Sequence, residues 1–282
     1  LGATSQDVLD TALMLLAHRA LAPTIADLAA CAAACAGLAG EHRLTPLAGR
    51  TLLQLAAPTT FGLLAAGWGA GLDRAGAGLA RVRAALPVQL GGAAGTMAAW
   101  HPHAGSVLTA FAAELGLAEP PAPWHTDRTV VTELAGALGT AAAAVAKPAT
   151  DVVLLAQDEL GEVREAAPGS SSTMAHKHNP IAAVTARAAA AQAPGLVANL
   201  LAAAAPELQR GAGPWHAEWP SLIGLLRAVG GAASRLRTSL TGLQVDAAAM
   251  ARNLARLDGV LDTGALGPAG DLVDRYLAGR PS

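Results

Sequence analysis

Apolar residues return at intervals of three and four along almost the whole chain, which is the spacing of one face of an α-helix. The run from Thr24 to His42 is an example, and Thr24 stands where a helix N-cap is expected. No stretch has the alternating, β-branched pattern between turns that predicts a strand. We therefore predict an all-α fold built from long helices. Further helical runs are expected at 59–86, 103–115, 127–163, 181–205, 218–240 and 246–257.

The high apolar content raises the question of a membrane. Hydrophobic residues make up 52% of the chain, and the mean hydropathy is +0.38. The stretch 134–146 is shorter than the roughly 20 residues that a spanning helix needs, and the stretch 188–206 contains Gln192, Pro194 and Asn199. We expect both stretches to be buried core helices of a soluble protein with no membrane partner.

Charge and cysteine content exclude other classes. The formal net charge is −2, and no run of Lys or Arg offers the basic patch that a nucleic acid requires. The two cysteines, Cys31 and Cys35, have no Cys/His set nearby that would complete a zinc site. We expect buried free thiols in a reducing compartment, and no metal. Because no signal peptide opens the chain, we expect it in the cytoplasm.

The loop 168–180 is the most unusual segment. It gathers hydroxyls, a lysine, two histidines and an asparagine directly before the helix expected from Ile181. The N-terminus of that helix carries free N–H groups and a partial positive charge, which favour anions. Lys177 and Asn179 add a cation and an amide donor. The loop is therefore a candidate site for a carboxylate-bearing substrate, with a serine to move a proton; the alternative is a solvated serine-rich linker.

The same loop carries a recognisable motif. Residues 171–180, Ser-Ser-Thr-Met-Ala-His-Lys-His-Asn-Pro, resemble the fumarase/aspartase superfamily signature Gly-Ser-Ser-x-Met-Pro-x-Lys-x-Asn-Pro. Ser170 stands where a glycine is expected, and Ala175 replaces the proline. Residues 2–7, 50–54 and 58–62 resemble the first two conserved regions of that superfamily. Several stretches are most similar to its subfamily of 3-carboxy-cis,cis-muconate cycloisomerases, namely 58–68, 91–96, 123–126, 157–163 and 215–219.

The resemblance implies a long-helix bundle that assembles as a homotetramer, with each active site drawn from three subunits and no cofactor. Enzymes of this superfamily add or remove a group β to a carboxylate through an enediolate. Ser171 matches the residue that transfers the proton, while Lys177 and Asn179 match those that hold the carboxylate. The resemblance also implies a second carboxylate-binding segment and further contacts with a dicarboxylate or tricarboxylate substrate. These residues are Thr4, Ser5, Gln6, Thr51, Gln54, Ser172, Met174, Arg210 and His216.

One departure bears on the reaction. Fumarases and purine-pathway lyases have Thr-His in the second region, whereas this chain has Thr51-Leu52. An amine or hydroxide leaving group needs a general acid, but the carboxylate that leaves a lactone does not. Leu52 therefore favours lactone chemistry. On the residues alone, Arg210 also fits a surface salt bridge and His216 a helix cap. We expect ordinary solvated or interhelix groups at Glu159, Glu162, His176 and His178.

We expect residues 1–240 to form the central bundle domain, with the signature loop at 168–180, and 241–282 to be a remnant of a small C-terminal helical domain. The N-terminal domain of the family is expected to be absent from this chain. The expected reaction interconverts 3-carboxy-cis,cis-muconate and its γ-lactone, 4-carboxymuconolactone, in the β-ketoadipate (protocatechuate) route of aromatic catabolism. The alternatives are a C–N lyase of the adenylosuccinate lyase type and a non-catalytic helical scaffold.

Overall fold

The computed structural model describes residues 2–169, 173–174 and 177–280. The chain divides into two compact units, each assembled from three separate stretches. Unit 1 contains residues 1–26, 76–142 and 191–230. Unit 2 contains residues 27–75, 143–190 and 231–282. The predicted boundary at residue 240 stays a prediction, and each unit is described by itself below.

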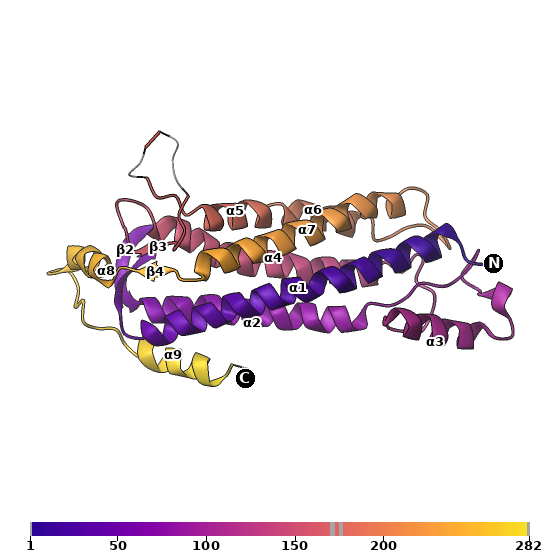
Figure 1. The fold of residues 1–282 in the computed structure, drawn as a ribbon, viewed down its shortest axis with the longest axis horizontal. Helices are drawn as coiled ribbons and strands as arrows, with labels where there is room; N and C mark the ends of the chain where they lie inside the picture. The colour runs from indigo at the N-terminus through magenta and orange to yellow at the C-terminus, as the bar shows by residue number, and fades with distance from the viewer. Residues whose placement is uncertain (1, 170–172, 175–176, 281–282) are drawn as a thin grey trace. The chain divides into compact units, whose positions relative to one another are not determined.

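Helices dominate the chain, as the periodicity predicts (Figure 1). Two local predictions are wrong. Thr24 does not cap a helix but lies inside one, where its hydroxyl donates to the carbonyl of Ala20 (2.9 Å). The run expected to reach residue 163 ends at Leu155. The α-helices are α1 (Ser5–Glu41), α2 (Phe61–Ala85), α3 (Ala104–Leu115), α4 (Thr129–Leu155), α5 (Ile181–Ala190), α6 (Ala193–Ala202), α7 (Pro214–Leu240), α8 (Ala247–Leu254) and α9 (Ala269–Ala278).

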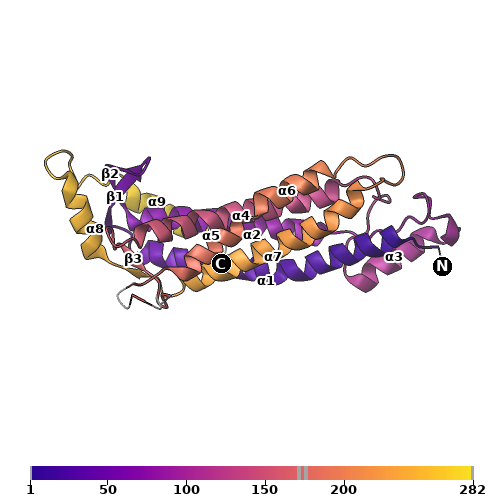
Figure 2. The same cartoon turned by 90° about the horizontal axis from the view of Figure 1, so that it is seen from above.

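The expectation of no strands is also wrong, because unit 2 contains two small antiparallel sheets. Strands β1 (Pro46–Thr51) and β2 (Gln54–Thr60) form a hairpin, and β3 (Val163–Arg164) pairs with β4 (Gln244–Val245). Figures 1 and 2 both show α8 beside the hairpin. Ala48 of β1 packs there against Leu254 of α8 and Leu257. This apolar contact is long-range, so a local search for alternating residues does not find it.

The hairpin turn is formed by Leu52 and Leu53, both of which have positive φ (51° and 65°). A two-residue turn with positive φ at both positions usually carries Asn or Gly, because a side chain with a Cβ is strained there. Both leucines are also exposed, at 97% and 72%. The turn therefore combines backbone strain with exposed apolar surface.

The cores of both units consist mainly of aliphatic side chains from the long helices. Cys31 and Cys35 are buried free thiols, as predicted, and burial raises the pKa of Cys31 to about 12. In unit 1 the core includes Leu13, Met14, Leu21, Leu79, Leu134, Leu138, Leu200, Leu222 and Leu225. In unit 2 it includes Leu28, Phe61, Ala65, Trp68, Leu72, Val145, Val152 and Leu236.

Three helical segments, α1, α4 and 181–202, are long and apolar enough to cross a membrane when judged by length and composition alone. The expectation that the stretches within 134–146 and 188–206 belong to a protein core without a membrane partner stays a prediction.

Candidate functional site

The N-terminal segment of unit 1 is fixed by a reciprocal cap at the start of α1. The amide of Thr4 donates to the Asp7 carboxylate (2.9 Å), and the amide of Asp7 donates to the Thr4 hydroxyl (3.4 Å). This arrangement is a capping box with an aspartate in place of the usual glutamate. It sets the backbone of Thr4, Ser5 and Gln6, the segment expected to bind a carboxylate.

Asp7 also joins this segment to a glycine-rich loop and to His125. Its carboxylate accepts from the amides of Gly91 (2.9 Å) and Gly92 (3.0 Å) and lies 2.7 Å from Nε2 of His125. Burial would raise the pKa of Asp7, but the hydrogen bonds from His125 and from backbone amides hold this pKa well below its usual range. A Cβ on Gly91 would lie 2.8 Å from the His125 ring, so this close approach requires glycine.

A second buried cluster lies one turn further along α1. Arg128 binds both oxygens of Asp10 (2.9 and 3.0 Å) and both oxygens of Glu218, and all three side chains are at most 1% exposed. The Trp215 indole donates to Asp10 (2.9 Å). Burial raises the pKa of Glu218 above its ordinary value, although Arg128 opposes the shift. The cluster pins α1 to the start of α4 and to the start of α7 within unit 1.

Arg210 connects the predicted substrate residues of unit 1. Its guanidinium donates to the hydroxyl of Thr4 (3.2 Å), the amide oxygen of Gln6 (3.2 Å), and the carbonyls of Gly92 (3.0 Å) and Ala93 (3.2 Å). All four acceptors are neutral, and no carboxylate pairs with Arg210 among the residues that the structure describes. The guanidinium therefore lies next to the segment expected to bind a carboxylate, with neutral acceptors as its hydrogen-bond partners among the described residues.

The remaining unit 1 candidates are less constrained. Ser5 is exposed at the first position of α1. His216 is exposed in the first turn of α7, where its ring lies 4.9 Å from that of Trp215 and 5.0 Å from that of Trp219. Gln6 is buried, and its side chain donates to the carbonyl of His125 (2.8 Å). Of this group, Gln6 shapes the segment while Ser5 and His216 face solvent.

In unit 2 the signature loop is closed at its base. Gly169 and Asn179 exchange two backbone hydrogen bonds (2.9 and 3.1 Å), so the loop leaves and returns at one place. Lys177 and Met174 are exposed, and Asn179 is half-buried beside Gly169. The predicted proton-transfer residue Ser171, its neighbour Ser172, and His176 lie outside the described residues.

The helix N-terminus after this loop differs from the sequence-based expectation. The amides of Ala182 (3.1 Å) and Ala183 (2.8 Å) donate to the carboxylate of Glu165, which is 3% exposed. The amide of Ile181 donates to the carbonyl of Asn179 (2.8 Å). An internal carboxylate thus already occupies the anion-binding position of α5. The expectation of free N–H groups there is wrong, because the sequence does not show that Glu165 folds back across the loop.

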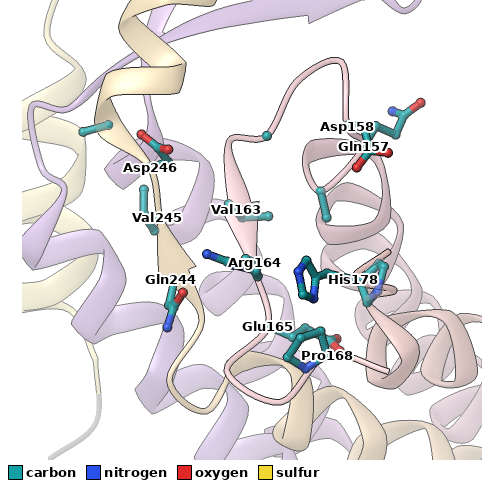
Figure 3. A pocket seen from close by; sticks show the side chains of 14 residues that line it. Gln157, Asp158, Val163, Arg164, Glu165, Pro168, His178, Gln244, Val245 and Asp246 are labelled. Atoms are coloured by element: carbon teal, nitrogen blue, oxygen red, sulfur yellow. The ribbon is translucent and has the colours of Figure 1, made fainter. Parts of the chain in front are cut away.

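A cavity of about 490 Å³ lies next to the base of the loop. Figure 3 shows Arg164 from β3, Gln244 from β4 and His178 from the end of the loop around this hollow. His178 is therefore exposed in a cavity wall next to Lys177 and Asn179. Because β3 alternates, Val163 and Glu165 are buried while Arg164 is exposed.

The residues of the second conserved region lie on the hairpin. Thr51 and Gln54 face each other across the Leu52–Leu53 turn, and both are exposed. Arg50 binds the Glu162 carboxylate through two hydrogen bonds (2.8 and 3.0 Å), and Asn253 donates to it as well (2.7 Å). Glu162 is fully buried, so its expected place among ordinary solvated or interhelix charges is wrong. It instead holds β1 close to the turn of the hairpin, through Arg50.

Comparison with known proteins places the chain in a family. The family model described as "Lyase" matches residues 1–195, and the chain belongs to this family, the fumarase/aspartase superfamily. The resemblance of the signature loop is thereby confirmed.

Two curated relatives and one solved structure carry the comparison further. The chain is 48% identical over 264 residues to a nitrosuccinate lyase of Streptomyces davaonensis and 47% identical over 265 residues to a 3-carboxy-cis,cis-muconate cycloisomerase of Pseudomonas aeruginosa. These matches cover 90% and 93% of the chain but only 56% and 58% of the relatives. The 3-carboxy-cis,cis-muconate lactonizing enzyme of Pseudomonas putida superposes with a TM-score of 0.90 at 35% identity, over 99% of this chain and 76% of that one.

The structure thus groups the predicted site residues by unit. Thr4, Gln6 and Arg210 are in contact in unit 1, while the hairpin pair and the end of the signature loop belong to unit 2. Residue-by-residue reasoning missed Asp7, His125, Arg128, Glu162 and Glu165 as organisers of these segments. Only Asp7 lies in a helix, and a charged residue in the sequence predicts a buried pair only when its partner is known.

Proposed function

We propose that this chain provides the central part of an enzyme that makes and breaks a bond β to a carboxylate, and that its reaction is the interconversion of 3-carboxy-cis,cis-muconate and its γ-lactone. Support comes from the cycloisomerase of Pseudomonas aeruginosa and from the lactonizing enzyme of similar fold. The observation that carries a reaction without a general acid is Leu52, an exposed leucine in the turn between Thr51 and Gln54, and the choice of lactonisation rests on the cycloisomerase relatives. Because leucine cannot donate a proton, the reaction must not depend on a general acid at position 52.

Lactonisation meets this condition. One substrate carboxylate oxygen forms a C–O bond to an alkene carbon. The alkene π electrons move to the adjacent carbon and into the carboxylate attached to it, which becomes an enediolate. Ser171 delivers a proton to that carbon; in reverse it removes the proton, and the C–O bond breaks with a carboxylate as the leaving group. Lys177 and Asn179 hold the carboxylate on which charge accumulates.

The remaining assignments complete this proposal. Thr4, Ser5 and Gln6, kept in place by Arg210, bind a second carboxylate, and Thr51, Gln54, Ser172, Met174 and His216 contribute further contacts. The active protein is a cytoplasmic homotetramer in which segments of different subunits meet. It binds its dicarboxylate or tricarboxylate substrate without a cofactor, a metal, a nucleic acid or a membrane.

A second candidate is favoured by the relative that acts on nitrosuccinate. Elimination from nitrosuccinate removes a proton from the carbon next to one carboxylate, breaks the C–N bond at the neighbouring carbon, and releases nitrite and fumarate. Nitrite is a weakly basic anion, so it also leaves without a general acid. Leu52 therefore disfavours an adenylosuccinate-type lyase, which expels an amine, but it does not separate nitrite elimination from lactonisation.

The test follows both reactions in purified protein. Loss of 3-carboxymuconate absorbance in the ultraviolet reports the cycloisomerase, and release of nitrite with fumarate reports the lyase. We expect Ser171→Ala to reduce turnover by about 1,000-fold, and Ser106→Ala, in an exposed position of α3, to leave it unchanged. Turnover that survives Ser171→Ala would contradict the proton-transfer assignment. A folded protein active in neither assay would support the scaffold alternative.

A further inference from the structure

Glu165 is an unusual acid for this part of the molecule. It follows β3 directly, its side chain is buried, and both of its oxygens accept hydrogen bonds from backbone amides of Ala182 and Ala183 in the first turn of α5. Glu165 and Ala182 are 17 positions apart in the sequence, and the segment between them includes the whole signature loop. The contact therefore joins the segment directly before the loop to helix α5, which begins directly after it.

The first amides of α5 have no capacity left for an external anion. Ile181 donates to Asn179, and the next two amides donate to Glu165. A substrate carboxylate at this place must accordingly be recognised by side chains. Lys177 and Asn179 stand four and two residues before Ile181. The Gly169–Asn179 bridge holds the backbone of Asn179, and Glu165 holds the helix that follows directly after it.

We propose that Glu165 is a positioning residue for the reaction proposed above. Its carboxylate occupies the N-terminus of α5, and it fixes the end of the signature loop so that Lys177 and Asn179 present their side chains to the substrate carboxylate. This inference rests on the proposed function for its kinetic consequence, while the anchoring contact stands independently of which reaction the protein performs.

A matched control exists in the same unit. Asp246 is a local carboxylate cap of α8 that accepts one hydrogen bond, from the amide of Ala249 (2.8 Å), and it does not bracket the signature loop. Asp246→Ala therefore reports the cost of losing a carboxylate cap. Any additional effect of Glu165→Ala reports the loop.

The kinetic test uses whichever of the two proposed reactions the purified protein performs. We expect Glu165→Ala to lower kcat/KM about 100-fold, since a displacement of about 1 Å in a positioning group costs about this much. Glu165→Gln keeps one acceptor oxygen and should lose about tenfold, while Asp246→Ala should remain within about twofold of wild type. Sodium formate should partly restore kcat in Glu165→Ala, where it fills the vacated anion position, but not in Glu165→Gln. A Glu165→Ala variant with wild-type kcat/KM would overturn the proposal.

Hydrogen–deuterium exchange separates this proposal from the proposed function. Glu165→Ala should speed exchange in a peptide covering residues 177–186 by at least tenfold, and Asp246→Ala should leave that peptide unchanged. If the wild-type protein performs neither reaction, the proposed function fails, and faster exchange still supports the anchor. Unchanged exchange in Glu165→Ala would show that the carboxylate does not hold the loop, and would overturn the inference.

Discussion

The N-terminal segment of unit 1 and the signature loop of unit 2 hold their polar groups by different means. Near Thr4, the two carboxylates of α1 are held by side chains from distant segments: Asp7 contacts His125, and Arg128 binds Asp10 and Glu218. At the signature loop, the Glu165 carboxylate is held by neutral backbone amides, and Lys177 stays exposed. The first region is thus fixed by interactions that are costly to break, while the second keeps a cation available to a ligand.

The largest expected effect on stability tests the first region. Arg128→Met leaves Asp10 and Glu218 buried without their cation, so we expect the free energy of unfolding to fall by about 3–5 kcal/mol. Urea denaturation at pH 7 measures this change. Lys147→Met, which removes the mostly exposed partner of Asp151, should cost less than about 1 kcal/mol. Equal losses in the two variants would contradict the contrast between buried and exposed ion pairs.

Asp7 provides the next effect, with a defined pH dependence. Asp7→Asn weakens the bonds from His125, Gly91 and Gly92 and should cost about 1–3 kcal/mol at pH 7. Because the folded pKa of Asp7 lies below its unfolded value near 4, its stabilisation is complete above about pH 4 and is lost as the pH falls below that value. The difference between wild type and variant should therefore shrink between about pH 4 and pH 2. A constant difference in urea denaturation over this range would refute the assignment.

The hairpin turn offers a gain rather than a loss. Leu53 has φ of 65°, so Leu53→Gly should relieve strain and raise the free energy of unfolding by about 0.5–1 kcal/mol. Leu55 lies in the extended strand β2, where the same change to glycine should lower stability. Thermal unfolding of both variants measures the contrast. If Leu53→Gly instead lowered the stability, the strain at this turn would not be the dominant effect, and the prediction would be wrong.

The smallest effect on stability belongs to Lys177, whose side chain is exposed. Lys177→Gln should change the free energy of unfolding by no more than about 0.5 kcal/mol. Its effect on turnover should instead be large, about 100-fold in kcat/KM, because the ammonium group stabilises developing carboxylate charge. Together the four variants separate residues that hold the site from those that act in it. Substantial unfolding of Lys177→Gln would place this lysine in the first group.

The sequence by itself determined the helical class and the family. Apolar spacing and alanine content predict helices because helix formation depends mainly on local chain geometry. The order of residues in the signature at 171–180 indicates the family. Even the departure at Leu52 could be interpreted in advance, since its consequence concerns leaving-group basicity rather than packing.

Only the tertiary structure shows which charged side chains already have a hydrogen-bonding or ion-pair partner within the protein. Glu162 and Glu165 are separated by three positions, yet one binds Arg50 and Asn253 while the other caps α5. The hairpin likewise depends on α8, which lies about 200 residues further along the chain. A buried carboxylate is stable only beside its donor, and that donor comes from a segment distant in sequence. Local patterns therefore predict where a charge stands, but only the folded chain shows what satisfies it.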